Sequence, residues 1–253
     1  MNIALVVLFV VALFGGVLLF LEIGRWIGRR GNVPEETPSL GALEGAVFGL
    51  MGLLVAFTFS GAAARFDTKR ELVVKEANAI GTAWLRLDLL PDSAQQQLRP
   101  EFRNYVDERI AVYRSIPDLA AARLHIDRGA AMQNRIWSQA VAACRDAGSP
   151  ATTSLVISSF NDMIDITTTR TVALQTHPPA IIFMLLFGVA LASSLLAGYG
   201  NAAKPRSWIH ILGFAAVLAI TAYIILDLEY PRIGVIRLDA VDQLLAQLRQ
   251  TMN

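Results

Sequence analysis

The sequence predicts an all-α membrane protein with four transmembrane helices and a helical extramembrane domain inserted between spans 2 and 3. Two observations support this fold class. Of the 253 residues, 54% are hydrophobic and only 17% are charged, whereas about 25% are charged in an average globular protein. The chain also contains four stretches without a charged residue, each close to the roughly 20 residues that a helix needs to cross the hydrocarbon layer. These stretches cover 3–21, 45–64, 178–203 and 207–226.

The first span is predicted over about residues 3–23. It is followed by basic and aromatic residues typical of a membrane interface, namely Arg25, Trp26, Arg29 and Arg30. A cleaved signal peptide is the alternative, and it requires a basic N-terminal segment and a small-residue cleavage site. The first two residues are uncharged, and the apolar run ends in Leu-Glu-Ile-Gly-Arg-Trp. We therefore expect an uncleaved first span.

The second span, predicted over about 42–64, is expected to continue as one helix far beyond the membrane. A seven-residue repeat of small or apolar residues, broken only at Arg70, keeps its phase through the membrane boundary near Arg65. Its members are Gly45, Gly49, Gly52, Ala56, Phe59, Ala63, Phe66, Val73, Ala77, Ile80, Trp84 and Leu87. Such a repeat marks one continuous helical face that packs on neighbours. The sequence therefore predicts a helix of about 48 residues and roughly 70 Å.

The residues of this repeat change in character halfway along the helix. In the membrane part, Gly41, Gly45, Gly49 and Gly52 are candidate helix-packing residues, because helices associate in lipid through close backbone approach. In the part outside the membrane the repeat becomes bulky and apolar, and burial of such residues in water is favourable. Two interpretations are open: packing within the chain, and packing around the axis of an oligomer.

Residues 65–176 are predicted to form the helical extramembrane domain, since apolar residues recur there at helical spacing and no alternating strand pattern of useful length appears. Ser149 and Pro150 are suited to the N-cap and first turn of one of its helices. The following region, 177–228, holds spans 3 and 4, over about 178–200 and 207–227. The tail, 229–253, is expected to contain a short amphipathic helix.

Three segments resemble the bacterial bestrophin-like membrane family, which is known mostly as a domain of unknown function. The segment EGAVFGLMGLLVAFTFSGAAARFD begins at Glu44, VVKEANAIGTAWLRLDLLP begins at Val73, and LDLEYPRIGVIRLDAVDQLL begins at Leu226. The resemblance covers nearly the whole chain.

Bestrophins are pentameric anion channels whose second span lines the pore and whose neck is a ring of bulky apolar residues. The resemblance therefore implies a homo-oligomeric, anion-preferring ion channel, with Phe57 and Phe59 as the nearest neck candidates. The sequence lacks an acidic cluster of the kind that binds calcium in the animal channels, so the resemblance does not imply calcium gating.

Apolar residues of the second span also suggest a constriction on their own. Phe48, Met51, Val55, Phe59 and Ala62 share a helical face with Glu44, and a hydrophobic constriction can gate a pore by dewetting. The other interpretation is that these residues face lipid or the protein core. The pore candidates are Phe48, Val55, Phe57 and Phe59. Glu22 and Glu44 lie near the membrane interface, where their carboxylates are expected to reach the headgroups.

Basic residues crowd the exit of the second span, at Arg65, Lys69 and Arg70. In an oligomer they would form rings that attract inorganic anions. Alternatively they bind acidic lipid headgroups or pair with carboxylates on the same helix.

Other functional classes find little support. The single cysteine, Cys144, excludes an intramolecular disulfide and a cysteine-cluster metal site. His125, His177 and His210 lie far apart, and no catalytic or nucleotide-binding motif is present. The net charge of +1 does not suggest a nucleic-acid partner. We expect no enzyme activity, no cofactor and no metal.

Four spans place both termini and the helical domain on the same side of the membrane. Basic residues of the short loops favour an exported domain, whereas the larger total of basic residues and the resemblance favour a cytoplasmic one. We expect a multi-pass protein of the bacterial inner membrane with cytoplasmic termini and a cytoplasmic helical domain. The alternative to a channel is a non-conducting membrane scaffold or signalling protein whose helical domain binds a protein partner.

Overall fold

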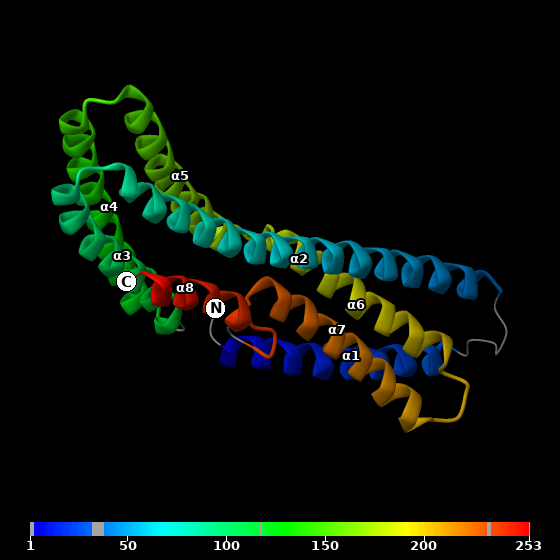
Figure 1. Cartoon of the computed structure of the whole chain (residues 1–253). Helices are drawn as coiled ribbons and strands as arrows, with labels where there is room; N and C mark the ends of the chain where they lie inside the picture. The colour runs from blue at the N-terminus through cyan, green and yellow to red at the C-terminus, as the bar shows by residue number, and fades with distance from the viewer. Residues whose placement is uncertain (1–2, 32–37, 117, 232–233, 253) are drawn as a thin grey trace. The chain divides into compact units, whose positions relative to one another are not determined.

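The computed structural model describes residues 3–31, 38–116, 118–231 and 234–252, and it confirms the all-α fold. Within these ranges the chain forms helices and no strand (Figure 1). In chain order the helices are α1 (Ile3–Arg30), α2 (Pro38–Arg86), the short 3-10 helix η1 (Leu87–Leu89), α3 (Asp92–Ser115), α4 (Leu119–Ala147), α5 (Pro150–Gln175), α6 (Ala180–Gly200), α7 (Trp208–Glu229) and α8 (Asp239–Thr251).

The chain divides into two compact units, each with its own core. The membrane unit consists of Met1–Phe66 and His177–Ile236, and the helical unit consists of Asp67–Thr176 and Arg237–Asn253. Helix α2 belongs to both units. It is one α-helix of 49 residues, so the prediction of a single long helix is confirmed.

The membrane unit contains α1, the first part of α2, α6 and α7. In the described part of the chain, four helical stretches are long and apolar enough to cross a membrane. Helices α1 and α6 approach at backbone distance, because a Cβ added to Gly24 would overlap the carbonyl oxygen of Leu195, and one added to Gly198 would overlap that of Leu21. Glycine therefore allows the contact between these two helices.

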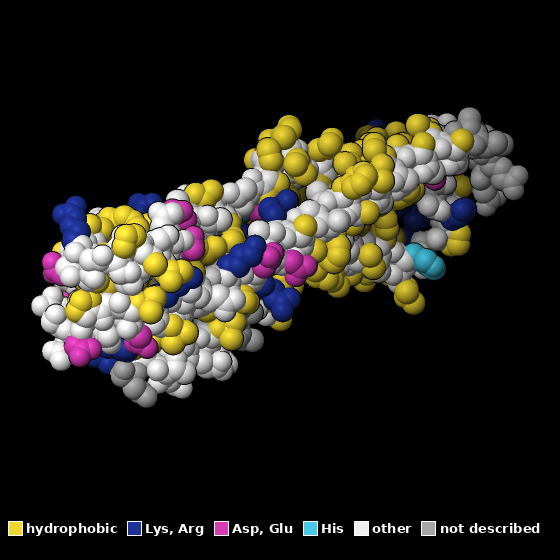
Figure 2. All heavy atoms as spheres, turned by 45° about the horizontal axis from the view of Figure 1, so that its top comes forward, with side chains coloured by type: hydrophobic (Ala, Val, Ile, Leu, Met, Phe, Trp, Pro, Cys, Tyr) yellow, Lys and Arg dark blue, Asp and Glu magenta, His cyan; other side chains and the backbone are white. Residues whose placement is uncertain are grey.

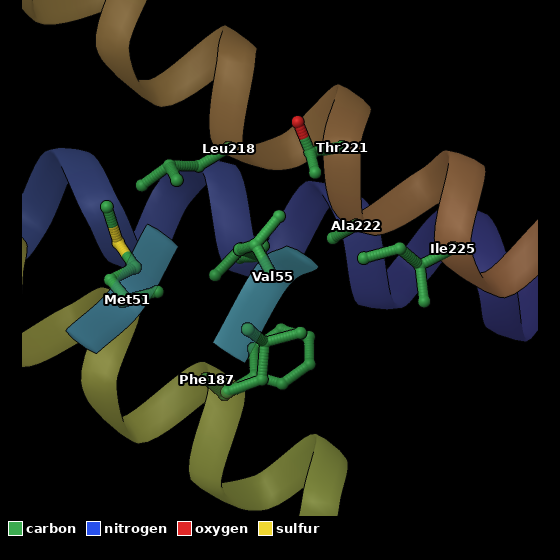
Figure 3. Close-up of a pocket in the computed structure, with 10 residues that line it drawn as sticks. Met51, Val55, Phe187, Leu218, Thr221, Ala222 and Ile225 are labelled. Carbon is green, nitrogen blue, oxygen red and sulfur yellow. The ribbon is translucent and has the colours of Figure 1, made fainter. Parts of the chain in front are cut away.

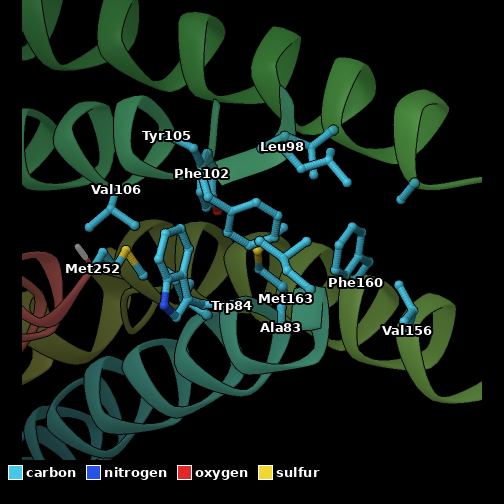
Figure 4. Packing of buried hydrophobic residues seen from close by; sticks show 14 of the residues in the cluster. Ala83, Trp84, Leu98, Phe102, Tyr105, Val106, Val156, Phe160, Met163 and Met252 are labelled. Carbon is cyan, nitrogen blue, oxygen red and sulfur yellow. The ribbon is translucent and has the colours of Figure 1, made fainter. Parts of the chain in front are cut away.

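The helical unit is built around one apolar cluster (Figure 4). Helix α2 contributes Trp84, α3 contributes Phe102 and α5 contributes Phe160. The rings of Trp84 and Phe102 lie 6.3 Å apart, and those of Phe102 and Phe160 lie 5.2 Å apart, both edge to face. Helix α8 belongs to this unit, because Leu245 is fully buried in the same cluster. The end of the chain thus completes the core of the helical unit.

Local signals explain where the helices of this unit begin and end. Ser149 caps α5 by accepting a hydrogen bond from the Thr152 amide, with Pro150 in the first turn, as the sequence predicts. Asp118 caps α4 by accepting from the amides of two residues in its first turn. Gly148 ends α4 in the left-handed conformation with φ of 66°, which glycine adopts without strain.

Candidate functional site

The membrane part of α2 has one face covered by its own chain. Phe48 packs edge to face on Phe214, with ring centroids 6.0 Å apart. Met51 is buried in the cluster of the membrane unit, and Val55 packs against the same cluster. Ala62 is completely buried beside Ile225. The covered face therefore includes Phe48 and Val55, two of the four predicted pore residues.

The opposite face of α2 is exposed along its length. We call it the open stripe and define it by six exposed residues whose spacings alternate between four and three, Leu53, Phe57, Ser60, Ala64, Asp67 and Glu71. This spacing keeps all six on one side of a helix. Phe57 is 66% exposed, whereas Phe59, about 160° around the helix from Phe57, is 45% exposed. Of the four predicted pore residues, only Phe57 therefore lies on the open stripe.

The predicted packing glycines also lie on uncovered parts of α2. A Cβ added to Gly41, Gly45, Gly49 or Gly52 would meet no described atom of the chain within 4 Å. Large exposed hydrophobic side chains lie nearby on α2, including Leu43 and Leu50. Figure 2 shows hydrophobic side chains crowded over parts of the surface. The role of these glycines in helix packing stays a prediction.

A small apolar cavity lies behind the covered face of α2 (Figure 3). The cavity has a volume of about 20 Å³, enough for little more than one water molecule. Met51 and Val55 line it from α2, Phe187 lines it from α6, and Thr221 and Ile225 line it from α7.

Arg65 does not point freely toward solvent. Its Nε donates a hydrogen bond of 2.8 Å to Oε2 of Glu229, and the Glu229 side chain is completely buried. The other carboxylate oxygen of Glu229 lies 3.0 Å from Nδ1 of His177. The His177 ring in turn lies against the ring of Tyr230, with centroids 4.4 Å apart. One carboxylate at the end of α7 thus links α2 to the segment that precedes α6.

The remaining predicted basic residues differ in exposure. Lys69 is only 4% exposed, so its ammonium group is turned into the protein. Arg70 is exposed and lies 3.6 Å from Asp67. Lys75 forms a 2.8 Å ion pair with Glu71. Of the predicted anion-attracting residues, Arg65 and Lys69 therefore face inward, while the acidic residues Asp67 and Glu71 lie on the open stripe.

Asp227 organises the turn after α7. Its carboxylate accepts hydrogen bonds from the amides of Val235 and Ile236, at 3.0 and 2.9 Å. A Cβ added to Gly234 would overlap this carboxylate, so a glycine is required at that position. This explains one acidic residue and the glycine of the LDLEYPRIG segment.

The two predicted interfacial carboxylates have different surroundings. Glu22 forms an ion pair with Arg206. The Glu44 carboxylate lies against Gly200 at the end of α6, since a Cβ added there would overlap it. Its Oε1 atom is buried and has no hydrogen-bond partner in the described part of the chain.

The helical unit contains a buried ionic cluster that the sequence did not predict. Glu76 of α2 is completely buried and accepts hydrogen bonds from Arg109, Arg170 and Tyr113. The Arg170 guanidinium also stacks on the Tyr113 ring, 3.8 Å from its centroid. Burial by itself raises the pKa of Glu76, but the two arginines outweigh it and hold that pKa below its ordinary value. The cluster joins α2, α3 and α5 through charge-assisted hydrogen bonds.

Sequence reasoning missed Glu229, Asp227 and Glu76 as organising residues. A signal for the first two was present, because acidic residues at the end of an apolar span need partners. Glu76 gave no such signal, since charged residues follow one another along that part of α2. Among the described residues, no group of three or more His, Cys, Asp or Glu side chains could hold a metal ion.

These features define a helical membrane protein with four candidate spans, the second of which is part of a helix of 49 residues. The protein-family model for the Bestrophin-like domain matches residues 8–242 of this sequence, so the chain belongs to the Bestrophin-like family.

The fold is also similar to a solved structure. The crystal structure of a bacterial bestrophin homologue from Klebsiella pneumoniae, in a variant with one tyrosine replaced by alanine, superposes with a TM-score of 0.63. The similarity covers 93% of this chain and 98% of that one, at 14% sequence identity. A comparison with curated proteins found no match. Resemblance to the family, inferred from sequence, is thereby confirmed.

Proposed function

We propose that this protein is a homo-oligomeric ion channel in which the open stripe of α2 lines the pore. The observation that supports this most directly is the exposure of Phe57 on a membrane helix whose opposite face is covered by its own chain. Membership of the Bestrophin-like family and the fold it shares with a bestrophin homologue support the same function.

The sequence of side chains along the open stripe suits a gated pore. Leu53 and Phe57 are bulky and apolar, so a ring of either would form a constriction from which water is easily expelled. Ser60 and Ala64 are small, so the pore would widen beyond that constriction. We therefore place the neck at Leu53 and Phe57. We leave out Phe59 because it points to another side of the helix, and Phe48 and Val55 because they contact their own chain.

The glycines of α2 suit assembly around an axis. Gly41, Gly45, Gly49 and Gly52 are open to the outside of the chain, and small residues allow helices to approach closely in lipid. A second copy of the same helix is the partner we propose for this surface. The family resemblance favours a pentamer.

The sidedness of the helical unit belongs to the same proposal. We place both termini and the helical unit in the cytoplasm of a bacterium, with the protein in the inner membrane. The alternative is export of the helical unit, which the basic short loops favour. Labelling of a cysteine introduced at Lys75 with a membrane-impermeant reagent, in intact cells and in inverted vesicles, distinguishes the two.

Conductance across a planar bilayer tests the channel function. We expect the purified wild-type protein to conduct and Phe57→Ala to conduct more. The smaller alanine side chains leave a wider opening, and a wider pore stays filled with water more easily. Phe48→Ala is the matched control, since it removes an equal side chain from the covered face of the same helix. Absence of conductance in a correctly folded oligomer would favour a scaffold or signalling protein instead.

A further inference from the structure

Glu229 uses both of its carboxylate oxygens to join separate parts of the membrane unit. The Arg65 guanidinium of α2 lies 2.7 Å from Oε2, and Nδ1 of His177 lies 3.0 Å from Oε1. The carboxylate is completely buried, while Arg65 and His177 are each about one-third exposed. Because a carboxylate only accepts, Nδ1 of His177 carries the proton of this hydrogen bond. The stacked Tyr230 ring holds the imidazole in place.

Among the described residues, α2 joins the apolar clusters of the membrane unit through side chains such as Met51 and Ala62. Its middle borders the apolar cavity through Met51 and Val55, and its first glycines meet no described atom. Gly61, one turn before Arg65, leaves space for the guanidinium, since a Cβ there would lie 3.2 Å from a terminal nitrogen of Arg65. The Arg65–Glu229 ion pair is therefore a directional, charge-assisted contact on a helix that also meets the membrane unit through apolar side chains such as Met51 and Ala62.

We propose that Glu229 and His177 are positioning residues for α2: through Arg65 they fix the lateral position of this helix and thereby the width of the constriction at Phe57. The inference rests on the proposed channel function. Phe57 lies eight residues, or about 12 Å, before Arg65 along the helix, so a shift at Arg65 is transmitted along a rigid element.

The first test measures the position of α2 directly. Spin labels are placed at Ser60→Cys on α2 and Val217→Cys on the exposed side of α7, after Cys144→Ala, and labelled protein is diluted with unlabelled protein in lipid nanodiscs. We expect Glu229→Gln to shift or broaden the distance distribution, and to change the open probability of the channel about fivefold or more. Glu22→Gln is the matched control, because it breaks an ion pair with Arg206 that does not involve α2.

A rescue experiment separates positioning from general stability. The swap of Arg65→Glu with Glu229→Arg is combined with His177→Gln, so that the new arginine meets a side-chain acceptor instead of the Nδ1 donor. It restores the pair with its charges exchanged, so we expect it to recover the wild-type distance and open probability. We expect His177→Gln, which keeps a side-chain donor, to have a smaller effect than His177→Leu.

The outcomes for this inference and for the channel function are distinguishable. An unchanged distance distribution in Glu229→Gln, or a swap that fails to restore it, overturns the positioning role whether or not the protein conducts. A shifted α2 in a protein that conducts no ions supports the positioning role and overturns the channel function.

Discussion

Glycine residues of the membrane unit have two different roles, which only their surroundings separate. Gly24 and Gly198 lie where α1 and α6 touch, and a Cβ at either would overlap a backbone carbonyl. Gly49 and Gly188 have no described atom within 4 Å of such a Cβ. The first pair therefore stabilises the fold of one chain, whereas the second pair is open to lipid or to another chain.

Replacement of Gly198 by alanine tests the role inside the chain. The new methyl group would force α1 and α6 apart, so we expect Gly198→Ala to lower the stability of the protein by about 1–3 kcal/mol, the usual effect of overpacking. Thermal unfolding in detergent measures this change. Gly188→Ala, on the same helix, should be neutral or slightly stabilising because alanine favours helix. Equal melting temperatures for Gly198→Ala and the wild type would contradict the close contact.

The buried Glu76 cluster makes the helical unit sensitive to acid. The pKa of Glu76 is lower in the folded protein than its ordinary value, so the stabilisation is fully present above the unfolded pKa of about 4.3. It is lost as the pH falls through the lower, folded value. We therefore expect stability to decline below about pH 4, as measured by denaturant unfolding at several pH values.

The Glu76→Gln variant is the comparison for this pH dependence. It should be less stable at neutral pH by about 3–5 kcal/mol, because Arg109 and Arg170 lose a buried partner. Its stability should also change less with acid than that of the wild type. A wild-type and a Glu76→Gln protein with parallel pH curves would assign the acid sensitivity to other groups.

The long helix α2 shows which elements the sequence could predict. The seven-residue repeat predicted its continuity, and its second half is explained within the chain, because Val73 and Ile80 are completely buried in the helical unit. The first half of the repeat stays uncovered at Gly45 and Gly49. A repeat in the sequence identifies a packing face, but it does not say whether the partner belongs to the same chain.

The candidate site was less predictable than the fold. Phe48 and Phe57 look alike in the sequence, yet one packs on Phe214 and the other is 66% exposed. Arg65 reads as a free basic residue at a membrane exit, but its partner, Glu229, lies 164 positions away. Both outcomes depend on how α6 and α7 fold back on α2, and local periodicity contains no information about that.

A bulky residue on the uncovered part of α2 tests the assembly that we propose. Gly49→Leu adds a side chain where a single chain has open space, so the fold should be retained. Between closely packed copies, however, the same side chain would prevent backbone contact. We expect a loss of oligomer in detergent, measured by native mass spectrometry, with unchanged helical content.

The control for this assembly experiment is Gly213→Leu on α7, where a Cβ also meets no described atom. If only Gly49→Leu disrupts the oligomer, the effect belongs to the surface of α2 and not to a leucine at any open glycine that faces lipid. If Gly49→Leu keeps the oligomer of the wild type, α2 does not contribute the interface.

At the scale of the whole molecule, the two units have separate cores and share one helix. The membrane unit is held together by apolar contacts and glycine contacts, and the helical unit by an aromatic cluster and the buried Glu76 ion pairs. The two cores therefore differ in chemistry, with aromatic contacts and buried ion pairs in one and close backbone contacts between helices in the other.

The ion preference of the assembled protein depends on which charges face the pore where α2 passes from one unit to the other. The anion preference predicted from sequence assigned this role to Arg65, Lys69 and Arg70. The open stripe instead presents Asp67 and Glu71, which pair with the exposed Arg70 and Lys75. If the stripe lines the pore, removal of one negative charge per chain must make the pore more favourable to anions. At close range in water one charge contributes about 1 kcal/mol, roughly a fivefold change in permeability ratio.

Reversal potentials in a KCl gradient measure this ratio. We expect Asp67→Asn to shift the reversal potential toward the chloride equilibrium potential, and Arg70→Gln to shift it toward that of potassium. The control is Asp162→Asn, which removes an exposed carboxylate from α5. A wild-type reversal potential close to that of potassium would show the anion preference to be wrong. Identical reversal potentials in the wild type and Asp67→Asn would mean that the open stripe does not face the ions. Salt screens the effect of a charge on an ion only beyond a Debye length of about 8 Å, so a carboxylate that lines the pore would still act on the ions.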